Sequence, residues 1–102
     1  MLQTIHHIAI ICSDYPTSKT FYTEILGLEI IKETYREERK SYKLDLALNG
    51  NYIIELFSFP NAPQRVSRPE AQGLRHLAFS VNDIESAIDE LNAKGVTTEA
   101  IR

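Results

Sequence analysis

The sequence predicts an α+β fold in which one strand–helix unit occurs twice within 102 residues. The segment His7-Ile8-Ala9-Ile10 returns as His76-Leu77-Ala78-Phe79, displaced by 69 positions. In each copy an aspartate, Asp14 or Asp83, follows the histidine by seven positions and stands where a helix is expected to begin. Each helix then ends at a glycine, and the second helix is one residue shorter. These matched features indicate one supersecondary unit used twice.

The first copy predicts the order β-α-β-β-β over residues 1–59. Its expected strands are apolar or β-branched segments: Ile5–Cys12, Leu28–Tyr35, Tyr42–Leu48 and Tyr52–Phe59. The helix is expected to begin at Asp14, to tolerate Pro16 in its first turn and to stop at Gly27. Asn49-Gly50-Asn51 predicts a hairpin turn between the last two strands.

The second copy is incomplete. Residues 60–73 contain three prolines and predict a linker, and residues 74–102 predict a second module that stops early. The expected elements of that module are a strand, a helix from Asp83 to Gly95 and a second strand, with the strands at Leu74–Val81 and Val96–Ile101. We therefore expect a single domain over residues 1–102, with the second module truncated at its C-terminus.

Composition and charge restrict the function classes. Apolar residues make up 43% of the chain and charged residues 25%, with a formal net charge of -3, which is typical of a globular domain. No basic stripe indicates nucleic-acid binding, and no apolar run reaches the roughly 20 residues of a membrane span. The single cysteine, Cys12, excludes an intrachain disulfide and is expected to be an inert, half-buried thiol. We expect a cytoplasmic protein that binds neither nucleic acid nor membrane.

Side-chain alternation places two histidines on corresponding faces. In the first strand Ile8, Ile10 and Cys12 form the bulkier apolar face, which is expected to pack on the helix. His7 then points to the opposite side, and the same alternation places His76 on that side of its own strand. A two-fold relation between the modules would bring His7 and His76 together in a concave interior.

Glu55 supplies a carboxylate for the same interior. It interrupts the apolar run Ile53-Ile54-Glu55-Leu56-Phe57, where a charge is costly unless it is paired or bound to a cation. Two imidazoles and one carboxylate are a common ligand set for one divalent ion of Zn, Ni, Co, Mn or Fe. Taken singly, a strand histidine is more often a hydrogen-bonded core residue, and a strand glutamate more often faces solvent. The matched parity favours a metal site of His7, Glu55 and His76, with His6 structural or at the surface.

At these residues the chain resembles the vicinal oxygen chelate superfamily, the glyoxalase, bleomycin resistance and dioxygenase proteins. The similarity is greatest to small bacterial glyoxalase I-like proteins and covers essentially the whole chain. The matching segments are His7-Ile8-Ala9-Ile10, Phe21-Tyr22-Thr23-Glu24-Ile25-Leu26-Gly27-Leu28, Ile53-Ile54-Glu55-Leu56-Phe57 and Gly73-Leu74-Arg75-His76-Leu77-Ala78-Phe79-Ser80-Val81.

The resemblance implies paired βαβββ modules that form an open-barrel cleft around one metal ion. It implies His7, Glu55 and His76 as ligands, with a fourth ligand, a glutamate, on a strand beyond Arg102 that also supplies the main catalytic base. Glu55 is then a ligand or a second base. Two chains often form the cleft in this superfamily, so we expect a homodimer.

The resemblance also orders the candidate functions. Metal-assisted proton transfer on a small carbonyl substrate, as in lactoylglutathione lyase (glyoxalase I), comes first because related epimerases usually carry Gln where Glu55 stands. A non-catalytic small-molecule binding or resistance protein and an extradiol dioxygenase-like enzyme are the alternatives. Ile11 and Phe59 stand where glyoxalase I enzymes commonly carry an Arg and an Asn for glutathione. The hemithioacetal of glutathione is therefore expected to be a poor substrate, unless Arg36, Arg65, Arg68 or Arg75 compensates.

Overall fold

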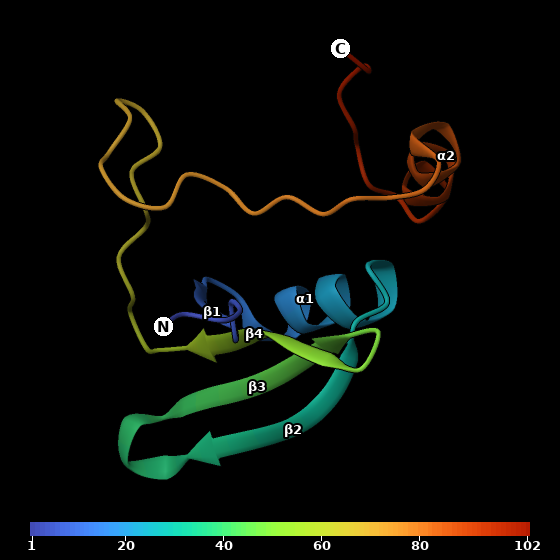
Figure 1. Cartoon of the computed structure of the whole chain (residues 1–102). Helices are drawn as coiled ribbons and strands as arrows, with labels where there is room; N and C mark the ends of the chain where they lie inside the picture. Colours follow the sequence, from blue (N-terminus) through green and yellow to red (C-terminus); the bar gives the residue numbers. More distant parts are fainter. The chain divides into compact units, whose positions relative to one another are not determined.

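The computed structural model describes residues 1–102, and the chain forms two compact units, Met1–Arg65 and Val66–Arg102. The first unit contains a four-stranded sheet and a helical segment, and the second contains one helix (Figure 1). The division between them lies inside the segment from residue 60 to residue 73.

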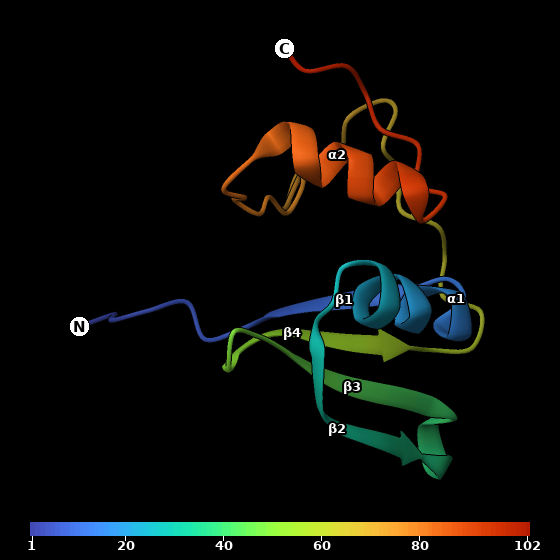
Figure 2. The same ribbon diagram turned by 90° about the vertical axis from the view of Figure 1, so that its right-hand side faces the viewer.

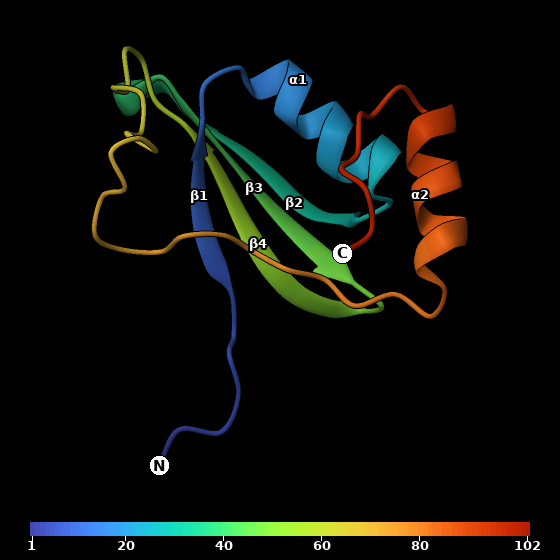
Figure 3. The same cartoon turned by 90° about the horizontal axis from the view of Figure 1, so that it is seen from above.

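The sheet of the first unit has the spatial order β1-β4-β3-β2, so β1 and β2 are its edges (Figure 3). Its strands are β1 (Ile8–Cys12), β2 (Glu29–Arg36), β3 (Ser41–Leu48) and β4 (Asn51–Ser58). β1 pairs with β4 in parallel, and the other two pairs are antiparallel. The predicted β-α-β-β-β order is confirmed.

The first strand is shorter than predicted. The expected range began at Ile5, whereas β1 begins at Ile8, where its pairing with Ile54 of β4 starts. The register with β4 includes no residue before Ile8, and a strand requires such pairing. His7 therefore precedes the strand instead of lying within it.

The helix after β1 begins as predicted. The Asp14 carboxylate accepts a hydrogen bond from the backbone N–H of Thr17 at 3.1 Å, and Pro16 lies in the first turn of α1 (Tyr15–Thr20). A π-helical turn, η1 (Phe21–Ile25), follows α1 directly. The helical segment ends before Gly27, which has φ +78°. A π-helical turn inserts one extra residue into an α-helix. This turn accounts for the one residue by which the first helix exceeds the second.

The core of this unit lies between the sheet and α1, which runs along one face of the strands (Figure 2). Its buried side chains come from the strands β3 and β4 and from the residue before β2: Leu28, Leu44, Leu46, Ile54 and Leu56. Ile10 and Cys12 pack against them, whereas Ile11 is 59% exposed, as the predicted alternation requires. Burial raises the pKa of the Cys12 thiol, which fits the expectation of an unreactive cysteine.

The two central strands are joined by the predicted hairpin turn. Asn49 and Gly50 both have positive φ, 50° and 80°, which is the backbone of the tight turns that match the twist of a hairpin. The preceding connection contains a short 3₁₀ turn, η2 (Glu37–Arg39), between β2 and β3. Lys40 follows it with φ 47°.

An ionic contact links the start of the helix to β2. Glu33 accepts hydrogen bonds from the Tyr15 hydroxyl and, at 2.8 Å, from the Lys19 ammonium. The Lys19 contact, followed by the Tyr15 contact, lowers the pKa of the Glu33 carboxyl below its ordinary value of 4.5. The contact therefore favours the folded state only while Glu33 is ionised.

Replacing Glu33 by glutamine is expected to flatten the acid limb of the stability curve. Because the folded pKa is depressed, the contribution of Glu33 is complete above pH 4.5 and is lost as the pH falls through the folded pKa. Urea unfolding at a series of pH values from about 6 to 3 measures this difference. Equal acid dependence in wild type and Glu33→Gln would refute it. Glu29→Gln, on the same strand and without an ion pair, is the control.

The second unit repeats the helix start of the first. Asp83 caps α2 (Ile84–Ala93) by accepting a hydrogen bond from the Ser86 N–H at 3.1 Å. Its φ and ψ, −139° and 107°, nearly equal those of Asp14, −136° and 104°. Gly95 has φ +86° just beyond the helix. The duplicated aspartate cap and glycine stop are confirmed in three dimensions. No helix in the structure combines the length and the apolar character needed to cross a membrane.

The two strands predicted for this unit, Leu74–Val81 and Val96–Ile101, are wrong. Both segments lack regular secondary structure. A strand needs a neighbour for its backbone hydrogen bonds, and no other segment of residues 66–102 pairs with either one. Leu77, Phe79 and Val81, which alternate with His76 as Ile8, Ile10 and Cys12 do with His7, remain 36%, 42% and 53% exposed.

Candidate metal centre

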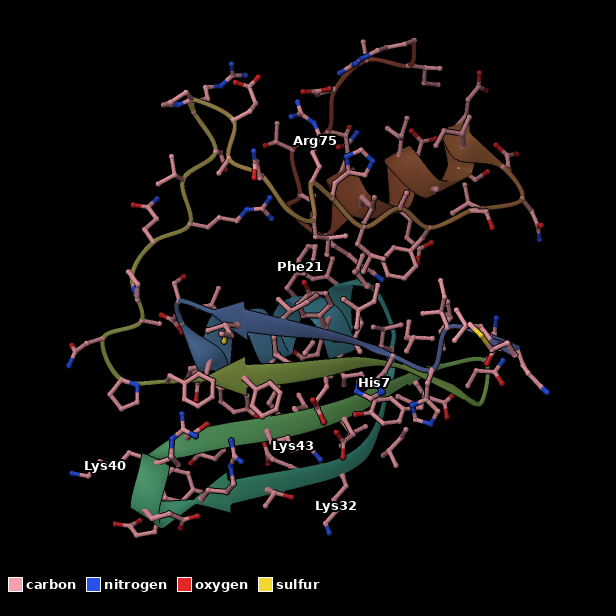
Figure 4. The ribbon with its side chains drawn as sticks, turned by 60° about the vertical axis from the view of Figure 1, so that its left-hand side comes forward. His7, Phe21, Lys32, Lys40, Lys43 and Arg75 are labelled. Carbon is pink, nitrogen blue, oxygen red and sulfur yellow. The ribbon has the colours of Figure 1, made fainter.

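The structure brings together two of the three predicted metal ligands. His7 Nε2 lies 3.8 Å from Glu55 Oε1. In the parallel pairing Glu55 is opposite Ala9, whose side chain leaves the sheet on the face opposite α1. His7 precedes Ala9 by two residues, just before β1, and its contact with Glu55 places it on the same side. We call this face of the first unit the open face. Figure 4 shows His7 beside the sheet, near the beginning of β1.

The ring of His7 is held from two sides. Its Nδ1 lies 2.7 Å from Nδ1 of His6, and its ring stacks on the Tyr52 ring with centroids 4.8 Å apart and planes 8° apart. One nitrogen is thus engaged by His6 while the other faces Glu55. A second contact of this kind is what orients a metal-binding imidazole in proteins. His6, predicted as structural or at the surface, is exposed and acts as a partner of His7.

His76, the third predicted ligand, belongs to the second unit. It lies in the extended segment before α2, without regular secondary structure. No group of three or more His, Cys, Asp or Glu side chains in residues 1–102 is arranged to hold a metal ion. The assignment of His76 therefore stays a prediction.

Three neighbours of Glu55 were missed by the sequence analysis: Lys43, Asp45 and Tyr52. Asp45 of β3 is directly opposite Glu55 of β4, and its side chain is buried, with 8% of the residue exposed. The Lys43 ammonium bridges the two carboxylates, 3.4 Å from an oxygen of each. The alternation Lys43, Asp45 against Leu44, Leu46 in the sequence could have placed both polar side chains on the face of Glu55.

The sequence pattern places Tyr52 on the wrong face of the sheet, for a physical reason. Glu55 follows Tyr52 by three positions, so regular alternation puts the two side chains on opposite faces. However, Leu46 pairs with Ile54 while the next residue, Ala47, pairs with Tyr52, which leaves Ile53 as the extra residue of a β-bulge. The bulge returns Tyr52 to the open face, where its hydroxyl donates to Asp45 Oδ1 at 2.7 Å and to Glu55 Oε2 at 3.3 Å.

The electrostatics of the cluster favour a cation. Burial, followed by the hydrogen bond to Asp45, raises the pKa of the Tyr52 hydroxyl, so this group stays protonated and donates at neutral pH. Lys43 supplies one positive charge against the two negative charges of Asp45 and Glu55. Lys43 already forms an ion pair with Glu55, so a bound metal is not needed to compensate the charge of this half-buried carboxylate. One negative charge nevertheless remains uncompensated beside His7.

The pair of His7 and Glu55 fits the expected ion. Two ligand atoms bound to one ion at about 2.0–2.2 Å stand roughly 3–3.5 Å apart. The 3.8 Å between His7 Nε2 and Glu55 Oε1 needs only a small adjustment to reach that spacing. The second oxygen of Glu55 faces Tyr52 and Lys43, which leaves Oε1 as the oxygen directed at the imidazole.

Comparisons with known proteins agree on one family. A family profile described as "Glyoxalase/Bleomycin resistance protein/Dioxygenase superfamily" matches residues 4–102. The uncharacterized protein YwkD of Bacillus subtilis (strain 168) is 65% identical over 102 residues, which are 100% of this chain and 80% of YwkD. A crystal structure of a glyoxalase family protein from Enterococcus faecalis superposes with a TM-score of 0.90 at 47% identity, covering 98% of this chain and 79% of that one.

More distant solved structures share the fold. Glyoxalase I of Leishmania major has a TM-score of 0.75 at 20% identity, over 99% of this chain and 73% of that one. An E126Q mutant of the fosfomycin resistance protein FosX from Listeria monocytogenes, complexed with Mn(II), has a TM-score of 0.75 at 19% identity, over 100% of this chain and 77% of FosX.

Proposed function

The chain belongs to the Glyoxalase/Bleomycin resistance protein/Dioxygenase superfamily, and on that premise we propose that it is a metal-dependent enzyme of glyoxalase I type. The proposed reaction is proton transfer on a small carbonyl substrate. The proposal includes one divalent ion of Ni, Zn, Co, Mn or Fe, held by His7, Glu55 and His76. A homodimer and a cytoplasmic location complete it.

The observation that carries the proposal is the approach of His7 Nε2 to Glu55 Oε1 at 3.8 Å. An imidazole whose other nitrogen is engaged, facing one oxygen of a half-buried carboxylate, is the arrangement expected of a ligand pair. The FosX structure contains Mn(II), which supports a divalent ion in a protein of this fold.

The residues of the open face would have different roles in the proposed reaction. The bound ion would polarise two neighbouring oxygens of the substrate and so stabilise an enediolate. Glu55 would be a ligand or a second base, with Tyr52 and Lys43 holding its Oε2. Lys43 also offers a positive charge to a developing oxyanion near Glu55, provided that it leaves Asp45.

Proton exchange in heavy water tests the function whatever product the reaction forms. Wild type loaded with each of the five metals is expected to retain about one ion per chain after dialysis. It should also exchange the proton next to the carbonyl of small hydroxy-carbonyl compounds, followed by NMR. Glu55→Gln should lose exchange, and Glu29→Gln should retain it. Failure to retain any metal, or exchange that ignores the Glu55 substitution, would contradict the proposal.

A non-catalytic binding protein is the second candidate, and one contact favours it. Lys43 lies 3.4 Å from Glu55 Oε2, so the site already contains a cation. In that case the chain would bind small molecules but retain no metal, and the Glu55→Gln variant would bind them as wild type does. The metal analysis above separates the two functions. The hemithioacetal of glutathione is expected to be a poor substrate, because Ile11 and Phe59 offer it no polar contact, unless Arg36, Arg65, Arg68 or Arg75 compensates.

A further inference from the structure

A second cluster occupies the open face beyond Glu55. Phe57 follows Glu55 by two residues on β4 and therefore leaves the sheet on the same side, about 7 Å further along the strand. Its ring stacks on that of Phe59, with centroids 5.6 Å apart and planes 14° apart. Ile11, opposite Phe57 on β1, is exposed. Together they form an apolar platform next to the carboxylates.

Two arginines lie over the rings of this platform. The guanidinium carbon of Arg36 is 5.4 Å from the centre of the Phe57 ring, and that of Arg39 is 4.8 Å from the centre of Phe59. Arg36 is the last residue of β2, and Arg39 belongs to the 3₁₀ turn η2 that follows it. Such cation–ring contacts fix the plane of the guanidinium and leave its edge free to donate.

The donors of these arginines lack acceptors. Neither side chain forms an ion pair, although Glu37 and Glu38 lie between them in the sequence. The Nε of Arg36 is buried and has no hydrogen-bond partner. A buried donor without an acceptor is rare in folded proteins and marks a place where an acceptor is expected. The guanidinium fork matches a carboxylate or phosphate group, which can accept two parallel hydrogen bonds.

We propose that Arg36, Arg39, Phe57 and Phe59 form an anion subsite that binds a carboxylate or phosphate group attached to an apolar or aromatic body. The arginines bind the anionic group and the rings bind the body. The position of Phe57, one side chain beyond Glu55, aims the remainder of such a molecule at His7 and Glu55. The inference rests on the proposed function in one respect, since it makes the bound molecule the substrate of that site.

The direct test is binding of benzoate and phenyl phosphate to protein treated with EDTA. The resonances of the Arg36 and Arg39 Nε–H groups and of the Phe57 ring are followed by NMR during each titration. We expect saturable shifts at these groups. Benzamide, which is uncharged, should bind at least tenfold more weakly than benzoate, and inorganic phosphate more weakly than phenyl phosphate. Comparison of the two anions shows which head group the subsite prefers.

Matched variants distinguish binding at this subsite from nonspecific attraction of an anion by positive charge. Arg36→Gln should weaken benzoate binding at least tenfold. Lys40→Gln removes the same charge four residues later, from a side chain without a cation–ring contact, and should change the affinity less than twofold. Arg36→Lys keeps the charge but not the fork and should fall between them, which preserves the test should Arg36→Gln fold poorly. Equal losses in Arg36→Gln and Lys40→Gln, or equal binding of benzoate and benzamide, would overturn the inference.

The metal-free design distinguishes this failure from failure of the proposed function. Benzoate binding without metal retention refutes the enzyme proposal and keeps the subsite. Metal retention with proton exchange but without shifts at Arg36 refutes the subsite and keeps the enzyme.

Discussion

Replacement of His7 by alanine is expected to weaken the binding of a divalent metal by more than 100-fold, about 2.7 kcal/mol. Loss of a partner that only orients a ligand already costs roughly 10–100-fold in affinity, so loss of the ligand itself must exceed that range. The loss follows from the position of Nε2, 3.8 Å from Glu55 Oε1. Competition with a chromogenic chelator measures the affinity of wild type and variant.

Three further variants divide the possible outcomes. His6→Ala removes only the contact to His7 Nδ1 and is expected to cost about tenfold. His76→Ala should match His7→Ala, because the proposal makes it an equal ligand. Glu29→Gln should leave the affinity unchanged. If the His7→Ala variant still binds metal with the affinity of wild type, the metal site proposed at His7 and Glu55 is wrong. If only the His76→Ala variant does so, the assignment of His76 as the third ligand is wrong.

The second large effect concerns stability. Leu56→Ala is expected to lower the free energy of unfolding by about 2–5 kcal/mol, because the side chain is fully buried and its removal leaves a cavity. A loss of this size is a large share of the roughly 5–15 kcal/mol that holds a typical domain folded. Leu56 of β4 belongs to the buried cluster on which Tyr15 and Tyr22 of the helical segment pack.

Urea unfolding followed by circular dichroism measures the loss. Ile31→Ala is the matched control: Ile31 is 54% exposed and lies at the irregularity of β2, where it pairs with no residue of β3. Its cost should stay below about 1 kcal/mol. Similar losses for Leu56→Ala and Ile31→Ala would show that the buried cluster does not dominate the stability of the first unit.

Local signals in the sequence were sufficient for the first unit. Alternation in Ile8–Cys12, the cap at Asp14 and the turn at Asn49 each act over a few residues, and all three have the predicted form. The prediction of strands in the second unit was wrong because a strand forms only when a second segment lies beside it and pairs with its backbone. An apolar, β-branched run such as Leu74–Val81 carries no information on whether a neighbour is present to pair with it.

At the candidate site, too, local sequence signals predicted some residues and could not predict others. His7 and Glu55 were predicted from parity, and the structure brings them together. Asp45 was within reach of the same argument, since it alternates with Leu44 and Leu46 and its strand neighbours that of Glu55. Tyr52 was not, because the one-residue bulge at Ile53 is a feature of the pairing and changes the face without changing the composition.

The parallel pairing of β1 with β4 has a consequence for the order of assembly. Ile8 bonds beside Ile54, 46 residues later, whereas the β3–β4 hairpin closes through a turn of two residues. Contacts between distant segments form late because the intervening chain must first be ordered. During synthesis the N-terminal residues therefore wait until β4 has left the ribosome. His7 meets Glu55 only in this last step, so capture of the proposed metal would report completion of the sheet.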